Sequence, residues 1–147
     1  MGLARFIAGH LPRWRTKSRS EPRHLVVGRE GENAAARHLR GLGFKILRRN
    51  FRARRGGEID LVCRDPSANA LVFVEVKSRT SEAFGRPLAA VDKKKRRLLI
   101  RAAMEWLRML DMPDITFRFD VVEVVGDEHP EVRHIENAFG LTRPFHY

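Results

Sequence analysis

The sequence carries its most chemically capable side chains in two short runs, residues 57–63 and 71–79. The first run contains Asp60, and the second contains the triplet Glu75-Val76-Lys77. Both runs are rich in β-branched and apolar residues, and turn-forming residues separate them, which is typical of a β-hairpin. In the simplest register Asp65 and Ala70 flank the loop, so Asp60 is expected to lie opposite Glu75.

Strand alternation sorts these residues onto two faces of the hairpin. One face is expected to carry Glu58, Asp60, Val62, Phe73, Glu75 and Lys77. The other is expected to carry Ile59, Leu61, Cys63, Val72, Val74 and Val76. The second face is plainly a core, so the charges are fixed on one side of two strands that otherwise look buried.

Two directly opposed carboxylates destabilise a sheet, because their side chains start only about 4.5–5.5 Å apart. A divalent cation between Asp60 and Glu75 would resolve the repulsion, and oxygen ligands suit Mg²⁺ or Mn²⁺. Lys77 would then lie beside the metal, where it could orient a water or neutralise a transferring phosphate. The alternative is an ion-pair cluster of Lys77, Glu75 and Asp60 at a solvated edge. Spacing alone does not separate the two.

A helix is predicted from about Arg29 to Leu42, because Ala35, Ala36, Leu39 and Leu42 recur at three- and four-residue steps and Gly43 follows as a stop. Glu32 falls on this apolar stripe and is expected to point inward, toward a metal site beneath the helix. The alternative is a first-turn glutamate that the helix dipole favours.

Two basic groups flank the hairpin. A strand begins at 44–47, and the connector 48–57 contains Arg48, Arg49, Arg52, Arg54 and Arg55. A second helix is expected to start near Pro87 or Asp92 and to end near Leu110, with the basic run Lys93, Lys94, Lys95, Arg96 and Arg97. Its apolar stripe is Leu88, Val91, Leu98, Ala102, Trp106 and Met109, and Lys95 interrupts it. These cations suit nucleic-acid phosphates; the alternative for both groups is a solvated surface.

The composition points to one domain with an anionic partner. The chain has 147 residues and a net charge of +11, which favours nucleic acid or an anionic membrane. No apolar run approaches the ~20 residues of a membrane span, so no membrane is expected. The single cysteine, Cys63, excludes a disulfide framework and a thiolate zinc site, and a cytoplasmic protein fits best. A flexible basic arm is expected over residues 1–27, a folded domain over 28–140 and a tail over 141–147.

Two further strands are expected, over 116–125 and 132–139. The first should place Phe117, Phe119 and Val121 on one face and Asp120 on the other. Asp120 is either a supporting acid of the site or the partner of Arg118.

The assembled motifs resemble the PD-(D/E)XK nuclease superfamily, with the restriction-endonuclease-like fold, and more specifically the bacterial YraN-like family. The resemblance covers about residues 28–140 and rests on 28–32, Asn50, 56–62, 73–77, Val91 with Lys95, and 118–122. It implies an α/β fold, a mixed β-sheet flanked by helices. A helical Glu, an Asp and a Glu-x-Lys pair also form the pattern of archaeal Holliday-junction resolvases.

The resemblance also implies an active site made of Glu32, Asp60, Glu75 and Lys77. Asp60, Glu75 and the Val76 carbonyl would hold Mg²⁺ or Mn²⁺, Glu32 would reach it through water, and Lys77 would position the nucleophile. The expected function is a metal-dependent endonuclease that hydrolyses phosphodiester bonds in DNA, with selectivity for branched structures open. The alternatives are an RNA-processing nuclease, or a nucleic-acid-binding module of the same fold without useful catalysis. DNA is preferred over RNA as partner, and a homodimer is left open.

Overall fold

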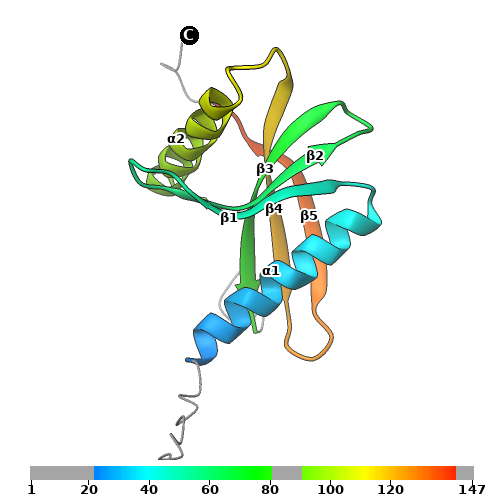
Figure 1. Cartoon of the computed structure of the whole chain (residues 1–147). Helices are drawn as coiled ribbons and strands as arrows, with labels where there is room; N and C mark the ends of the chain where they lie inside the picture. The colour runs from blue at the N-terminus through cyan, green and yellow to red at the C-terminus, as the bar shows by residue number, and fades with distance from the viewer. Residues whose placement is uncertain (1–21, 81–90, 142–147) are drawn as a thin grey trace, which may run out of the picture.

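The computed structural model describes residues 22–80 and 91–141, which form one mixed five-stranded sheet with a helix on each face (Figure 1). The chain runs α1 (Arg23–Gly41), β1 (Lys45–Arg52), β2 (Glu58–Asp65), β3 (Ala70–Arg79), α2 (Lys93–Met109), β4 (Thr116–Val125) and β5 (Glu131–Phe139). The strands lie in sequence order; β3 and β4 pair in parallel, and the other neighbours pair antiparallel. Parallel pairing needs a crossover connection, and α2 lies within it. This α/β architecture is consistent with the expected restriction-endonuclease-like arrangement.

Two hydrophobic clusters, one on each side of the sheet, hold the layers together. The cluster under α1 joins Ala35 and Leu39 to Leu61, Val74 and other residues of β2, β3 and β4. The cluster under α2 joins helix residues to a second set of sheet side chains, among them Ile59, Val62, Phe73, Phe119 and Val121. Because both faces are covered, the central strands are apolar on both sides, which explains their nearly continuous hydrophobic runs.

Several strand predictions are confirmed. Leu61 lies opposite Val74 and Asp65 opposite Ala70, as the hairpin register required. Strand β4 has the predicted bounds, and β5 lies at the edge of the sheet as expected. The first strand was predicted wrongly: β1 continues to Arg52, so half of the expected connector is strand and residues 53–57 form the turn.

Helix α1 ends as predicted but begins earlier. Gly43 has φ +92°, its N–H donates to the Arg40 carbonyl, and the Phe44 N–H donates to the Leu39 carbonyl, which is the bond pattern of a Schellman motif. Leu42, placed on the apolar stripe by its spacing, is 55% exposed because it follows the last helical residue. The helix starts at Arg23, inside the range assigned to the flexible arm; residues 1–21 and 142–147 lie outside the described part of the chain.

Helix α2 begins at Lys93 with Asp92 as its N-cap, which accepts from the Lys95 N–H at 2.8 Å, so the second of the two predicted starts is confirmed. The predicted stripe was partly wrong. Met109 is 65% exposed, whereas Leu99, Ile100 and Leu107 are buried. Leu88 lies outside the described residues.

Among the residues that the structure describes, no helix combines the length and apolar content needed to cross a membrane.

Helix α1 lies close to β3 at Gly31. A Cβ atom at this position would lie 1.7 Å from the Ser78 Oγ and 2.8 Å from the Ser78 Cβ. Rotation of the Ser78 side chain could move its Oγ, but the Cβ is fixed by the backbone. Only glycine therefore allows the helix to rest on the strand at this point, one residue before Glu32.

We expect Gly31→Ala to lower the free energy of unfolding by about 1–3 kcal/mol, because the added methyl group overpacks the helix–strand contact. Gly28→Ala is the matched control on the same helix, since a Cβ there would meet nothing within 4 Å. The control should be neutral or stabilising by up to about 1 kcal/mol, because alanine favours helix. Urea denaturation measures both, and a Gly31→Ala protein as stable as Gly28→Ala would contradict the close contact.

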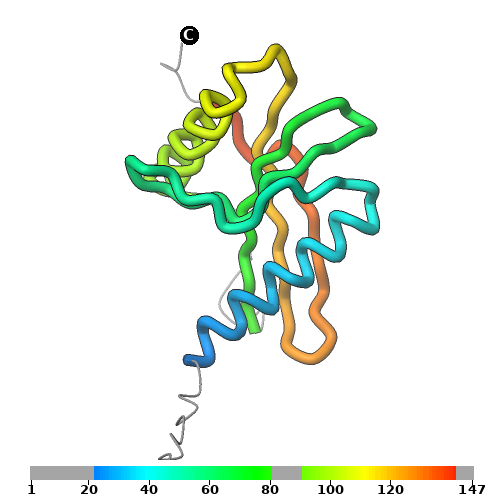
Figure 2. The backbone as a smooth tube through the Cα atoms, viewed as in Figure 1, coloured from blue at the N-terminus to red at the C-terminus, as the bar shows by residue number. Residues whose placement is uncertain are grey.

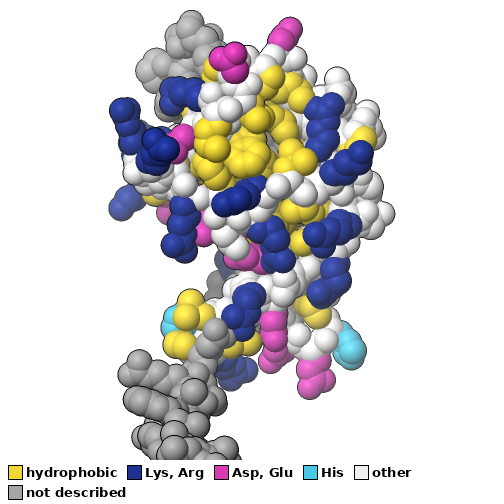
Figure 3. Space-filling view, viewed as in Figure 1, with side chains coloured by type: hydrophobic (Ala, Val, Ile, Leu, Met, Phe, Trp, Pro, Cys, Tyr) yellow, Lys and Arg dark blue, Asp and Glu magenta, His cyan; other side chains and the backbone are white. Residues whose placement is uncertain are grey.

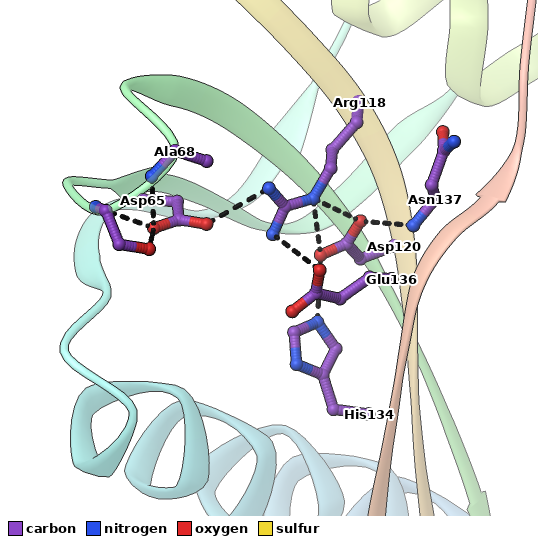
Figure 4. Close-up of polar contacts among 8 residues, drawn as sticks. Asp65, Ala68, Arg118, Asp120, His134, Glu136 and Asn137 are labelled. Carbon is purple, nitrogen blue, oxygen red and sulfur yellow. Dashed lines mark hydrogen bonds and ion pairs between the residues drawn. The ribbon is translucent and has the colours of Figure 1, made fainter.

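A buried polar network joins the β2–β3 turn to β4 and β5 (Figure 4). Asp120 is 0% exposed and accepts from the Arg118 Nε at 2.9 Å and the Asn137 N–H at 2.9 Å; His134 Nε2 lies 2.8 Å from its other oxygen. Arg118 also donates to Asp65 at 3.0 Å. Of the two roles considered for Asp120, partner of Arg118 is therefore confirmed, and its contacts are made within this network.

Asp65 is the network's acid-sensitive member. Hydrogen bonds from Ser67, then from the Ala68 N–H and Arg118, outweigh its burial and lower its pKa from 3.8 to about 2. A carboxyl whose pKa is lower in the folded protein stabilises the fold above its unfolded pKa, and this contribution is lost as the pH falls toward the folded value.

We expect Asp65→Asn to be less stable than the wild type near neutral pH, with the difference shrinking as the pH falls from about 5 to about 2. Asp114→Asn, which changes an exposed aspartate, should show a much smaller and flatter difference. Chemical denaturation at a series of pH values measures both. A stability difference for Asp65→Asn that stays constant over this range would contradict the assignment.

Candidate active site

The central feature of the site is an open edge on strand β3. The pairing of β2 with β3 begins at Leu61 and Val74, whereas β4 pairs with β3 along its whole length, from Ala70 to Arg79. Residues 75–79 therefore have β4 on one side and no partner from β2 on the other. Figure 2 shows the divergence: β2 turns aside toward the β1–β2 turn while β3 continues beside β4.

Asp60 lies where the two strands part. Its Oδ2 accepts a hydrogen bond from the backbone N–H of Val76 at 2.7 Å, so a side chain takes the place of a ladder bond. The N–H and C=O of one strand residue point toward the same edge. The Val76 carbonyl therefore points to the same open edge as Asp60, where the sequence analysis placed a metal ligand.

The side chains of β2 stop alternating regularly between the two faces of the sheet at Asp60. The predicted assignment of hairpin residues to two faces is therefore wrong at this end of β2. Ile59 packs in the cluster under α2, together with Val62, whereas Leu61 packs under α1. Asp60 lines a pocket on the α1 side, and Glu75 pairs with a residue of α2. The β2–β3 ladder ends at the pair of Leu61 with Val74, so Asp60 and Glu75 do not form the predicted cross-strand pair.

Glu75 is a buried carboxylate with one oxygen unsatisfied. The residue is 6% exposed, and its Oε1 lies 3.4 Å from the Nζ of Lys95 on α2. Its Oε2 is buried without a hydrogen-bond partner. The alternative to the metal site was an ion-pair cluster of Lys77 with Glu75 and Asp60; the structure pairs Glu75 with Lys95.

The electrostatic environment of Asp60 disfavours its charged form. Burial is the largest cause and the negative charge of Glu75 the next, with Glu32 adding to them; the Val76 N–H and Lys95 act in the opposite direction. Together they raise the pKa of Asp60 from 3.8 to about 7. The negative charge of Glu75 therefore acts on Asp60, although the two residues are not paired in the β2–β3 ladder.

Glu32 reaches the same site from α1. Asn50 donates to its Oε2 at 3.1 Å, and Arg49 lies 3.9 Å from the same oxygen. Glu32 and Asp60 line one pocket of about 980 Å³ between α1 and the open edge of β3. The other lining residues are Arg23, His24, Val27, Gly28, Val76, Ser78, Arg79 and Thr80. The inward direction predicted for Glu32 is confirmed.

Lys77 lies on the open-edge segment of β3, two residues after Glu75. It is half-buried, and its Cα lies opposite that of Glu123 in β4. Strand alternation places Lys77 on the same face as Glu75, the α2 face. Glu32, Asp60, Glu75 and Lys77 are thus gathered around one segment of β3, on both of its faces.

The donor atoms at the open edge fit a divalent cation. Within residues 22–80 and 91–141, no three His, Cys, Asp or Glu side chains come together as a metal-binding group. The expected ligand set is smaller: two carboxylates, a backbone carbonyl and water. The unsatisfied Oε2 of Glu75 and the raised pKa of Asp60 both indicate negative charge without sufficient compensation, which a bound cation would supply.

The turn between β1 and β2, residues 53–57, is fixed against α2. Gly57 has φ +103°, and a Cβ there would lie 2.4 Å from the Leu98 carbonyl oxygen. The Arg54 N–H donates to the Glu105 carboxylate at 3.0 and 3.1 Å, and Arg101 donates to the Arg55 carbonyl at 3.0 Å. The backbone of this turn is therefore held while the side chains of Arg54 and Arg55 remain exposed.

The ten cations predicted to bind nucleic acid fall into two groups. Seven are exposed: Arg48, Arg52, Arg54, Arg55, Lys93, Lys94 and Arg97. The other three are half-buried and bonded within the protein: Arg49 donates to Asn33, Arg96 to the Val91 carbonyl, and Lys95 pairs with Glu75. Figure 3 shows Lys and Arg side chains around the end of the molecule where the β1–β2 turn lies on α2.

Sequence reasoning missed the residues that support the site. Asn50 and Arg49 hold Glu32, and Arg101 and Glu105 hold the arginine turn. One signal was present for the second pair. Arg101 and Glu105 are four residues apart on a predicted helix, so they share a face.

Comparison with known proteins places the chain in a family. The model of the family described as "Uncharacterised protein family UPF0102" matches residues 31–124. A UPF0102 protein of Anaeromyxobacter dehalogenans is 50% identical over 124 residues, which cover 83% of this chain and 90% of that protein. One of Geotalea daltonii is 46% identical over 118 residues, covering 79% and 91%. The match includes the segments that carry Glu32, Asp60, Glu75 and Lys77, and the chain belongs to the UPF0102, or YraN-like, family.

Proposed function

We propose that this protein is a metal-dependent endonuclease that hydrolyses phosphodiester bonds in DNA. The observation that carries the proposal is the pair of carboxylates at the open edge of β3, of which Glu75 is buried and Asp60 half-buried. Glu75 has an oxygen without a hydrogen-bond partner, and the pKa of Asp60 is raised to about 7. Such groups persist when they serve a cation or a proton transfer, because as structure alone they are unfavourable.

The residues divide the chemistry among them. Asp60, Glu75 and the Val76 carbonyl would hold Mg²⁺ or Mn²⁺, and Glu32 would contact it through water. The bound metal would supply charge neutralisation at the phosphate and lower the pKa of a water. Lys77, on the face of Glu75, would orient that water or balance charge on the phosphate. The pocket between α1 and β3 supplies the space for the substrate backbone.

The exposed cations would hold the substrate. Arg54 and Arg55 project from a turn whose backbone is fixed on α2, so little conformational freedom of the backbone is lost on binding. Arg97 and Arg101 are one helical turn apart on the helix that supports this turn. Contacts of this kind recognise phosphates and carry no sequence information, which favours DNA recognition by backbone or shape.

The alternatives share these residues. An RNA-processing nuclease would use the same carboxylates and the same cations. A binding module of the same fold would need only the cations, and nothing in such a role requires an acid beside an acid at an open strand edge. The carboxylate pair therefore favours catalysis over binding alone.

We expect Asp60→Asn, Glu75→Gln and Lys77→Ala each to reduce metal-dependent cleavage by about a hundredfold or more, since each removes a group that contacts the metal or the reacting water. Purified proteins are incubated with linear, flapped and four-way DNA and with RNA, in Mg²⁺ or Mn²⁺. Glu58→Gln is the matched control, because Glu58 pairs with Arg52 on the surface and should be dispensable.

Binding of intact DNA should survive in these three variants, because the phosphate contacts come from other residues. If wild-type protein cleaves none of the substrates above the level of Lys77→Ala, the catalytic proposal is wrong and the binding module takes its place. Cleavage of RNA alone would reassign the substrate and keep the site.

We expect the double variant Arg54→Ala/Arg55→Ala to bind DNA more weakly and with a smaller salt dependence. Each phosphate contact contributes roughly −0.9 to the slope of log affinity against log salt, so the slope should fall by about 2. Arg37→Ala/Arg40→Ala removes the same charge from exposed positions on α1 and should leave the slope nearly unchanged. Fluorescence anisotropy over a salt series measures both, and equal losses in the two variants would indicate a net-charge effect without a defined surface.

A further inference from the structure

Lys95 is the only residue of the Lys93–Arg97 run that contacts the carboxylates of the candidate site within the described part of the chain. Its Nζ lies 3.4 Å from the Glu75 Oε1, and its charge also acts on Asp60. The neighbouring Lys93 and Lys94 are exposed, whereas the side chain of Lys95 is 35% exposed. One lysine of three consecutive ones therefore turns inward, toward Glu75.

The position of Lys95 on its helix makes this direction informative. It lies in the first turn of α2, where the helix dipole disfavours a cation, and the only acid at this helix end among the described residues is the N-cap Asp92, whose carboxylate accepts from the Lys95 N–H. Lysine also has a long flexible chain that could reach water from here. The inward direction is explained by the negative charge at the open edge of β3.

We propose that Lys95 is an internal counter-cation that neutralises Glu75 in the metal-free protein, competes with the divalent cation and so sets the metal affinity of the site. The inference rests on the proposed metal site. It concerns the group that balances the negative charge of that site before a metal ion binds. The ammonium lies near the Glu75 Oε1 and leaves the Glu75 Oε2 without a hydrogen-bond partner, so its compensation is partial. A divalent cation can displace it because the cation brings more charge and more coordination positions.

The competition has a thermodynamic consequence with a definite sign. Lys95 stabilises the metal-free protein by attraction to the carboxylates and destabilises the metal-bound protein by repulsion of the cation. Both effects weaken metal binding. Loss of the ammonium should therefore raise the affinity for metal while it lowers the stability of the metal-free fold. A residue that merely packed α2 against β3 would affect stability without this opposite effect on affinity.

The test is isothermal titration calorimetry of the full-length protein with MnCl₂ after removal of metal by chelation. We expect Lys95→Met to bind Mn²⁺ about tenfold tighter than the wild type, or more, because one nearby positive charge is lost. Lys94→Met, which removes the same charge from an exposed neighbour on the helix, should stay within about twofold of the wild type, since solvent screens it. Lys95→Arg keeps the charge and should remain close to the wild type.

Thermal melts in EDTA supply a second measurement. Lys95→Met should melt lower than Lys94→Met without metal, and added Mn²⁺ should narrow the difference. If Lys95→Met does not fold, Lys95→Gln is titrated in its place. Asp60→Asn/Glu75→Gln should bind no Mn²⁺ and reports whether the observed heat comes from this site.

The outcomes separate the inference from the function on which it rests. If the wild type binds Mn²⁺ and Lys95→Met binds it equally or more weakly, the counter-cation role is wrong and the metal site stands. If the wild type binds no Mn²⁺, both the metal site and the counter-cation role fail. An equal gain in Lys94→Met would show a general charge effect and would also overturn the role of Lys95.

Discussion

The separation of β2 from β3 at Asp60 is the constraint on which the candidate site depends. Beyond this point β3 remains anchored by β4 through parallel pairing, so the strand stays extended although β2 no longer pairs with its other edge. The unpaired edge offers backbone groups, and the Asp60 carboxylate takes one of them, the Val76 N–H. A sheet in which β2 followed β3 to its end would have used the same groups in the ladder and left no room for a ligand.

Two glycines position the elements around this edge. Gly31 lets α1 rest on β3 at Ser78, which places Glu32 over the pocket, and Gly57 lets the β1–β2 turn rest on the backbone of α2 at Leu98. The first contact lies on one face of the sheet and the second on the other. The acidic residues and the arginine turn are therefore held by backbone contacts that a larger residue would disrupt, and the side chains themselves need not provide that support.

Much of the fold could be predicted from the sequence, because turn-forming residues mark the ends of its elements and the alternation of apolar and polar residues marks its strands. The turn at 65–69 set the register of the hairpin, and Gly43 ended α1 where expected. The change of phase at Asp60 could not be predicted, because Ile59 is apolar and suits the core under either helix. The extent of β1 was missed for a related reason: β1 is an edge strand with mostly exposed side chains, so its arginines resembled a loop. Consecutive apolar residues at Leu98, Leu99 and Ile100 likewise left the buried face of α2 ambiguous.

The unpaired edge of β3 also has a consequence for the behaviour of the protein in solution. An exposed strand edge is a template onto which a strand of another molecule can add, and such additions lead to aggregation. Along this edge the alternating side chains Glu75, Lys77 and Arg79 are all charged, and α1 lies over the opposite face at Ser78. Charge on a strand edge discourages a second strand from pairing there. These charges therefore disfavour strand addition at this edge, and we expect neutral replacements at these positions to reduce solubility as well as charge.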